Sequence, residues 1–294
     1  MKAFAVTVAV ALAALGVACF DAVAEGDEIV FCSARSGNWE IWTVNVETGD
    51  LKQITTTAAD ERSPCWSPDK KRIAYSNNVG ELWVVNRDGT GARKLETGQE
   101  QCDQPDWHPD GESLLFVAYF VRQGEKSKVY SIRVAAEKAG SVDLLVDRDS
   151  LVQYPAWLPG GQALIYSEFK RGSLEEPIEE LWVREIANGQ DTQITRTGVQ
   201  NVNADYSRDG MKILFVSTLR DNHDVWCLAA DAQRLVRLTT HHGFDGEPCW
   251  SPAGDRIAFV STVDGHRNVW VMKSDGSEKR QLTQGSGDCR DPDW

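Results

Sequence analysis

The feature that most constrains the fold of this chain is a single phrase that recurs along it. The phrase is an aromatic residue, a Ser-Pro-Asp-Gly-like turn, and then an apolar run such as Ile257-Ala258-Phe259. The aromatic anchors follow one another at intervals of 41 to 50 residues, and they are Trp66, Trp107, Trp157, Tyr206, Trp250 and Trp294. Internal repeats of this length are typical of four-stranded propeller blades.

Each repeat carries the signals of four short strands. The first holds the aromatic anchor, and the Pro and Gly of the turn favour a tight reversal into the apolar second strand. A third strand has its own aromatic residue, as in Asn268-Val269-Trp270, and a turn at Asp275-Gly276 leads to a fourth strand that ends Gln281-Leu282-Thr283. The sequence therefore predicts an all-β fold, a six-bladed β-propeller of four-stranded antiparallel blades.

The two ends of the repeat array complement each other. Pro292-Asp293-Trp294 matches a first strand with no second strand after it, and residues 29–33 match a second strand with no first strand before it. We therefore predict one blade made of one C-terminal and three N-terminal strands. Such closure removes exposed sheet edges. Residues 25–294 are expected to form this single domain.

Ten of the eleven tryptophans occupy one of two fixed repeat positions. A large ring at a fixed blade position fills the wedge between neighbouring sheets, so we expect these ten to pack between blades. Trp39 is the exception, because it falls in a loop between the second and third strands. It is the tryptophan we consider for a ligand.

The first 24 residues have the pattern of a cleaved secretory signal. Lys2 precedes an apolar run over residues 3–17, and Ala22-Val23-Ala24 is a small-x-small cleavage site. A lipoprotein box at residues 15–19, with Cys19 as its cysteine, is the alternative, but Gly16 stands where a larger aliphatic residue is usual. No stretch reaches the length of a membrane span. The sequence predicts a periplasmic or secreted protein.

The charge of the chain restricts its partners. The formal net charge is −13, and no run of basic residues occurs. Nucleic acid and anionic membranes require clustered Lys and Arg, so neither is expected as a partner. We expect a monomer that recognises a protein or a glycan.

Several phrases resemble the TolB-type propeller repeat, and the resemblance covers residues 29–294. Trp66-Ser67-Pro68-Asp69, Trp250-Ser251-Pro252 and the run over residues 268–277 match it most closely. In that family the propeller is a protein-binding platform in the cell envelope, a gate on serine peptidases or, in a related seven-bladed branch, a pectin-fragment lyase. The chain departs from the family because the N-terminal α/β domain of TolB and the hydrolase domain of the peptidases have no counterpart here.

Two functional hypotheses follow. The first is an exported, non-catalytic binding propeller that recognises an envelope protein or glycan through loops at the channel rim. The alternative is a lyase-like or hydrolase-like enzyme acting on a sugar or small polar substrate over the channel, with or without a divalent metal. The sequence has no Gly-x-Ser-x-Gly elbow, phosphate loop or His-Glu-x-x-His motif, so no catalytic residue and no cofactor is nominated.

One loop holds candidate metal ligands. It contains His241, His242, Asp245 and Glu247. The competing interpretation is a solvated polar loop, because the lyase branch takes its histidines from several blades whereas this chain offers them from one.

Six cysteines remain after removal of the signal, and export permits disulfides. Cys65 and Cys249 share one repeat position, and Cys102 and Cys289 share another. The pattern predicts the pairs Cys65–Cys102 and Cys249–Cys289, with buried thiols as the alternative. Cys32–Cys289 is a rival pairing.

The predicted binding rim is the set of residues that lead into the first strands. They differ in every repeat although the neighbouring aromatic residue barely changes, as recognition of an asymmetric partner requires. The set comprises Glu61, Ser63, Gln104, Gln153, Tyr154, Asn201, Asn203, Asp245, Glu247, Arg290 and Asp291.

Overall fold

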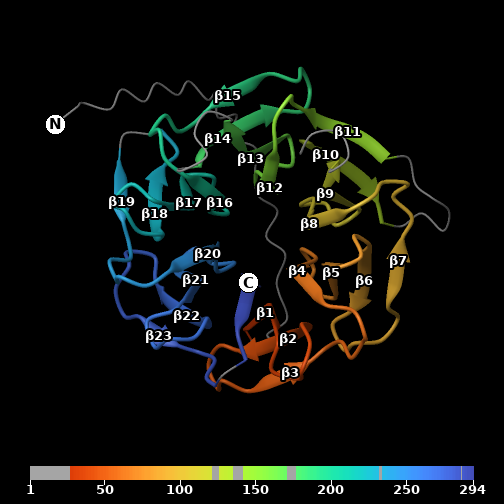
Figure 1. Ribbon diagram of the computed structural model, residues 1–294, viewed down its shortest axis with the longest axis vertical. Coiled ribbons are helices and arrows are strands. Elements are labelled where there is room, and N and C mark those ends of the chain that lie inside the picture. Colours follow the sequence, from red (N-terminus) through yellow and green to blue (C-terminus); the bar gives the residue numbers. More distant parts are fainter. Residues whose placement is uncertain (1–26, 121–125, 135–141, 171–176, 232–233, 286) are drawn as a thin grey trace.

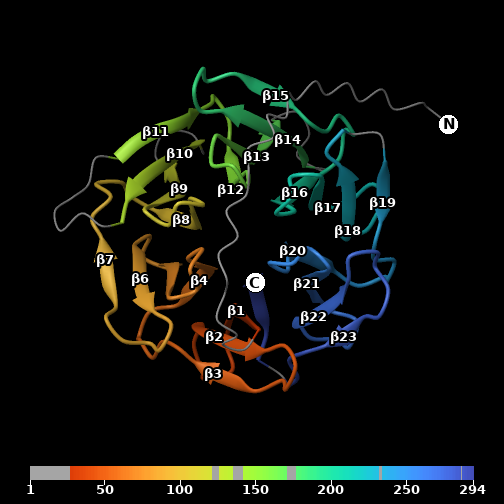
Figure 2. The ribbon, with the colours of Figure 1, turned by 180° about the vertical axis from the view of Figure 1, so that it is seen from behind.

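The computed structural model describes residues 27–120, 126–134, 142–170, 177–231, 234–285 and 287–294. These residues form 24 strands in six four-stranded antiparallel sheets arranged around a central channel (Figures 1 and 2). The predicted six-bladed β-propeller is confirmed. The expected signal sequence and Cys19 lie outside the described residues. Within the described residues, no helix is long and apolar enough to cross a membrane.

The blades are numbered along the chain, and each is given from its inner strand outward. Blade 1 contains β24 (Cys289–Asp293), β1 (Glu28–Ser33), β2 (Glu40–Asn45) and β3 (Leu51–Gln53). Blade 2 contains β4 (Glu61–Trp66), β5 (Arg72–Asn77), β6 (Leu82–Asn86) and β7 (Arg93–Leu95). Blade 3 contains β8 (Cys102–Trp107), β9 (Ser113–Phe120), β10 (Lys126–Arg133) and β11 (Val142–Asp147). Blade 4 contains β12 (Val152–Trp157), β13 (Ala163–Lys170), β14 (Ile178–Glu185) and β15 (Asp191–Gln193). Blade 5 contains β16 (Asn201–Tyr206), β17 (Lys212–Ser217), β18 (Asp224–Ala229) and β19 (Leu235–Arg237). Blade 6 contains β20 (Asp245–Trp250), β21 (Arg256–Ser261), β22 (Asn268–Lys273) and β23 (Arg280–Gln281).

Blade 1 closes the ring in the predicted way. β24 pairs antiparallel with β1, with Val30 opposite Asp293 and Cys32 opposite Arg290. In Figure 1 the C-terminal strand lies at the centre of the molecule beside β1. The backbone N–H of Trp66 in blade 2 also donates to Asp293 Oδ2 at 2.7 Å, so the end of the chain holds two neighbouring blades.

The threonines at the predicted ends of the fourth strands have a different role from the one expected. β3 ends at Gln53, before Thr55, and the Thr55 hydroxyl accepts the backbone N–H of Ile41 at 2.8 Å. Thr283 accepts the N–H of Val269 at 2.9 Å in the same way. This threonine recurs because its side chain replaces a ladder hydrogen bond where the outer strand leaves the sheet.

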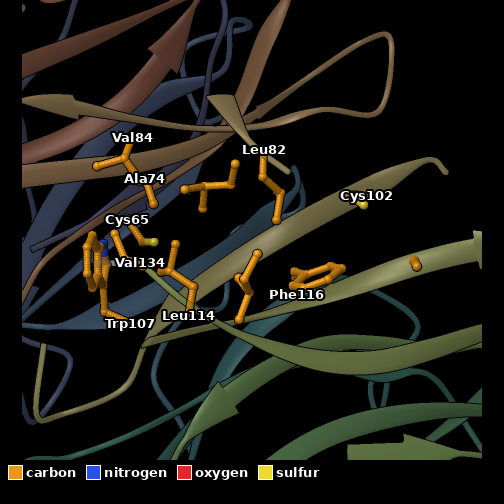
Figure 3. Close-up of a cluster of buried hydrophobic side chains, with 12 residues drawn as sticks. Cys65, Ala74, Leu82, Val84, Cys102, Trp107, Leu114, Phe116 and Val134 are labelled. Atoms are coloured by element: carbon orange, nitrogen blue, oxygen red, sulfur yellow. The ribbon is translucent and has the colours of Figure 1, made fainter. Parts of the chain in front are cut away.

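The hydrophobic core consists of six clusters, one at each interface between neighbouring blades. Figure 3 shows the cluster between blades 2 and 3, where Cys65 and Ala74 of blade 2 meet Trp107 and Phe116 of blade 3. All eleven tryptophans belong to these clusters or pack against them. The inter-blade role predicted for the ten repeat-position tryptophans is confirmed.

The predicted disulfides between neighbouring blades are not formed, and both cysteines of each pair are buried and free. Cys65 is the fifth residue of β4 and Cys102 is the first residue of β8. Four residues of strand separate these two positions by about 13 Å, whereas a disulfide needs Cα atoms within about 7 Å. The same offset separates Cys249 in β20 from Cys289 in β24.

The rival pair, Cys32 and Cys289, is also not formed. The two residues lie on adjacent strands, but Cys289 is opposite Ser33 and not opposite Cys32. Because side chains alternate along a strand, the two thiols point to opposite faces of blade 1. Cys32 packs toward blade 2 and Cys289 packs toward blade 6.

Candidate functional site

All six inner strands carry a β-bulge at the same position. The third residue of each strand has a left-handed backbone, with φ between 50° and 55°, and none of the six is glycine. We call this set the bulge residues, and its members are Ser63, Gln104, Tyr154, Asn203, Glu247 and Asp291. Left-handed φ costs a non-glycine residue about 1–2 kcal/mol, and bulges are a common means of redirecting a side chain. Here the bulges face the central channel.

The channel holds a cavity of about 450 Å³. Its walls are the third, fourth and fifth residues of all six inner strands, together with Cys32, Trp39, Glu61, Arg62, Asp103 and Arg290. The fourth residue is proline in five of the six strands, which an inner edge strand tolerates because the missing N–H would face the channel. The cavity therefore begins where the inner strands start and extends inward to their fifth residues.

Most of the predicted rim residues line this cavity. They are Glu61, Ser63, Gln104, Tyr154, Asn203, Glu247, Arg290 and Asp291. Gln153, Asn201 and Asp245 do not line it. Asn201 is fully buried and donates to the carbonyls of Glu179 and Val199, so it joins two loops instead of facing the channel.

Trp39 lies in the same cavity as the bulge residues. The sequence analysis considered Trp39 for a ligand but did not include it in the predicted binding rim. A loop between the second and third strands of a blade emerges at the end of the sheet where the inner strand starts. Trp39 packs against the cluster between blades 1 and 2, and the Arg290 guanidinium lies 4.9 Å from the centre of its ring.

Three aspartates at the inner end of the cavity were not predicted. Asp106, Asp205 and Asp293 precede the aromatic anchors of blades 3, 5 and 1, whereas blades 2, 4 and 6 have the small residues Cys65, Ala156 and Cys249. Each aspartate accepts the backbone N–H of the next blade's tryptophan through Oδ2, at 2.7–2.8 Å. The alternation is visible in the sequence, but the hydrogen-bond partner lies in another repeat.

Burial changes the titration of the cavity carboxyls. It raises the pKa of Asp106 to about 8, and the charges of Asp293 and Asp205 add to the rise. Burial raises the pKa of Asp205 to about 7. The pKa of Glu247 also rises to about 7, through burial and then the charge of Asp291.

The mouth of the cavity holds a further carboxyl with altered titration. Glu61 is 2% exposed, and its pKa rises to about 7 through burial, with the nearby Glu40 carboxylate adding to the effect. Against these acidic groups, Arg62 and Arg290 are the basic side chains that line the cavity. The cavity therefore favours neutral or cationic ligands over anions.

The four candidate metal ligands are not brought together. His241 Nδ1 accepts the N–H of Gly243, and its ring lies 4.2 Å from that of His242. Asp245 is buried, while Glu247 pairs with Arg267 at 3.2 Å in the channel. Across the described residues, no group of three or more His, Cys, Asp or Glu side chains is placed to hold a metal ion.

Comparisons with known proteins agree with this architecture. An uncharacterized protein of Agrobacterium fabrum is 26% identical over 214 residues, which are 72% of this chain and 69% of that protein. TolB from Acinetobacter baumannii superposes with a TM-score of 0.75 at 20% identity, over 92% of this chain and 67% of that chain. A TolB-like protein from Agrobacterium tumefaciens superposes with a TM-score of 0.73 at 23% identity, over 89% of this chain and 90% of that chain. These two structures share the fold.

The family assignment rests on a separate comparison, with sequence families. The sequence family described as the TolB beta propeller domain (PD40) matches residues 117–294, which is more than half of the chain. That segment contains the inner strands β12, β16, β20 and β24, with four of the six bulge residues. The chain belongs to the TolB β-propeller family.

Proposed function

We propose that this chain is an exported, non-catalytic binding propeller that recognises a protein of the cell envelope across the mouth of its central channel. The observation that carries the proposal is the contrast within the cavity wall. Six bulges of the same backbone geometry present six different side chains to one cavity of about 450 Å³. A side chain needed only for the scaffold would recur, whereas recognition of an asymmetric partner uses different groups.

Two further observations support a protein partner in the envelope. The chain belongs to the TolB β-propeller family, and TolB is among the structures that share its fold. The N-terminal pattern of residues 1–24 is that of an export signal. Trp39 and Arg290, at the mouth, are residue types enriched where protein interfaces derive most of their affinity.

The proposal is tested by site-specific cross-linking in intact cells. Trp39 is replaced by the photoreactive residue p-benzoylphenylalanine, and a second protein carries the same residue at Met211. Met211 is 54% exposed in the turn between β16 and β17, at the end of the blades opposite to the cavity mouth. We expect one envelope protein to be cross-linked from position 39 and not from position 211.

Substitutions at the bulge residues test whether the cross-linked protein binds at the cavity. Glycine is used because it accepts the left-handed φ of these positions without strain. The variants are Gln104→Gly, Tyr154→Gly, Asn203→Gly and Glu247→Gly, each first shown to unfold cooperatively. We expect at least two of them to reduce the cross-link from position 39 by tenfold or more. An unchanged cross-link in all four variants contradicts a partner site at the cavity.

A further inference from the structure

The bulge residues are linked to one another by hydrogen bonds that pass from blade to blade. Glu247 Oε2 of blade 6 accepts the N–H of Asp291 in blade 1 at 2.8 Å. Asp291 Oδ2 in turn accepts the N–H of Ser63 in blade 2 at 3.2 Å. In each case a side-chain oxygen of one bulge residue satisfies the backbone N–H of the next.

The chain of hydrogen bonds continues through blades 3 and 4. The Ser63 hydroxyl donates to Asp103 Oδ1 at 2.9 Å, and the same oxygen accepts the N–H of Gln104 at 2.7 Å. Gln104 Oε1 then accepts the N–H of Tyr154 at 2.7 Å. Five of the six bulge residues are therefore joined in one series, which we call the rim chain.

The rim chain is interrupted at blade 5. Among the described residues, no side-chain oxygen accepts the backbone N–H of Asn203 or of Glu247, and the side-chain amide of Asn203 makes no hydrogen bond. The backbone of Asn203 has the same left-handed φ, 52°, as the bulge residues that are linked. The N–H of Asn203 therefore has the same orientation as the N–H groups of the linked bulge residues. In the linked blades a side-chain oxygen accepts this N–H, and at Asn203 that oxygen is missing.

The residue at position 154 accounts for the missing link to the N–H of Asn203. Gln104, Glu247 and Asp291 have flexible or short side chains whose oxygen reaches the N–H of the adjacent blade. Tyr154 carries its oxygen at the far end of a rigid ring, so it cannot turn back to the adjacent N–H. The side-chain amide of Asn203 and the N–H of Glu247 are two further hydrogen-bond donors at the same gap.

The charges around the gap select among the oxygen-bearing groups that could enter it. Burial raises the pKa of Tyr154, and the nearby carboxyls of Asp291, Glu179, Glu247 and Asp103 add to the rise. Glu179 is 5% exposed, and its Oε2 has no hydrogen-bond partner. A carboxylate or phosphate would be repelled here, whereas a neutral carbonyl oxygen is not.

We propose that the gap at Asn203 is the place where the partner's peptide backbone binds, through a main-chain carbonyl oxygen that takes the place of the missing side-chain oxygen. The partner segment is uncharged or positively charged, because it enters a cavity in which seven carboxyls and two arginines are the charged side chains of the wall. The N–H and side-chain amide of Asn203 donate to this carbonyl. The inference rests on the proposed function, because it assigns the contact point of the same site.

The test uses small capped amino acids as probes and protein labelled with ¹⁵N at asparagine. N-acetyl-lysine N-methylamide is expected to shift the backbone and side-chain resonances of Asn203, with a Kd on the order of 1 mM for a ligand of this size. N-acetyl-glutamate N-methylamide, with the same backbone and opposite charge, should bind at least tenfold more weakly. N-acetylglucosamine is the third probe, and preferential binding of this sugar at Asn203 overturns the assignment to a peptide.

Two variants at position 154 distinguish the effect of closing the gap on probe binding from the effect of losing the tyrosine ring. Tyr154→Gln gives blade 4 a glutamine at its bulge position, like Gln104 in blade 3, whose side chain accepts the N–H of the next blade. The new glutamine oxygen should accept the N–H of Asn203 in the same way. We expect the N–H resonance of Asn203 to move downfield without any probe, and the lysine probe to bind at least tenfold more weakly. Tyr154→Phe keeps the ring and should change binding less than threefold.

A control is Asp209→Asn, which places a carboxamide in the exposed turn between β16 and β17, at the end of blade 5 opposite to the gap. This variant should leave probe binding unchanged. Wild-type affinity in Tyr154→Gln, or shifts that spare Asn203, overturns the inference. If this occurs while cross-linking from position 39 persists, the proposed function stands and the assigned contact point is wrong. Loss of both results rejects the two proposals together.

Discussion

The third and the sixth residues of each inner strand repeat in opposite ways. The sixth residue is aromatic in every complete blade repeat, as in Trp66, Trp107 and Trp250, and it packs between blades. The third residue keeps its backbone angle in all six blades while its side chain changes every time. The repeat therefore keeps the type of side chain at one position and only the backbone angle at the other. The side chain at the second kind of position can differ between blades without altering the apolar packing between them.

Among the tests of this comparison, removal of an aromatic anchor should have the largest effect on stability. Trp107 is 4% exposed in the cluster between blades 2 and 3. We expect Trp107→Ala to lower the free energy of unfolding by about 3–5 kcal/mol, as for large buried aromatics in general. Denaturant unfolding measures the change. The control is Trp39→Ala, which alters a partly exposed side chain at the cavity mouth and should cost less than half as much; equal losses would contradict the comparison.

An intermediate effect on stability is expected from the buried aspartates at the fifth position of the inner strands, between the third and the sixth. The pKa values of Asp106 and Asp205 rise to about 8 and about 7, so the folded state binds more protons than the unfolded state above about pH 4. The stability from these groups is fully present below about pH 4 and is lost as the pH rises through 7 and 8. We expect the protein to be less stable at pH 8 than at pH 5 by about 1–3 kcal/mol.

The double variant Asp106→Asn/Asp205→Asn should reduce this pH dependence, because Asn retains an oxygen for the tryptophan N–H of the next blade. Thermal unfolding at several pH values measures it. Asp209→Asn is the control, since hydrogen bonds from Ser207 and Met211 lower the pKa of that exposed carboxyl and move its titration below the tested range. An unchanged slope in the double variant would assign the pH dependence to other groups.

The smallest effect is expected at a bulge residue. Asn203→Gly removes a side chain with no hydrogen bond in the described structure and relieves a left-handed φ of 52°. We expect the free energy of unfolding to change by less than about 1 kcal/mol. Asn203→Val should cost more than about 1 kcal/mol, because a β-branched residue is strained in this conformation. A large loss for the glycine variant would show that this bulge residue is part of the scaffold.

The fold could be predicted because its signals are local and recur. The turn after each aromatic anchor and the apolar second strand are readable within one repeat, and the two incomplete ends specified blade 1. The positions of Ser63, Gln104 and Asn203 followed from the same reasoning. The bulge itself was not predicted, because the sequence signal of a left-handed non-glycine residue, an enrichment of Asn and Asp, is present in only two of the six blades.

Contacts between individual polar or cysteine side chains and other repeats were the part that sequence reasoning missed. The disulfide prediction used shared repeat positions of Cys65 and Cys102 without the distance along the strands. Asn201 has the polar character of a rim residue, but its role depends on the carbonyls of two loops. Asp205 meets its partner, the N–H of Trp250, only after the ring has formed. Contacts of this kind depend on how successive blades are rotated around the channel.

The composition of blade 1 has a consequence for the order of folding. Its inner strand, β24, is synthesised after the other strands of the described chain, and it must find β1 across more than 250 residues. Contacts of such sequence separation carry a high loop-closure entropy and slow folding. Until β24 is in place, blade 1 lacks its channel wall and Trp66 lacks its contact with Asp293. The ring therefore stays open until the last strand of the described chain has been synthesised.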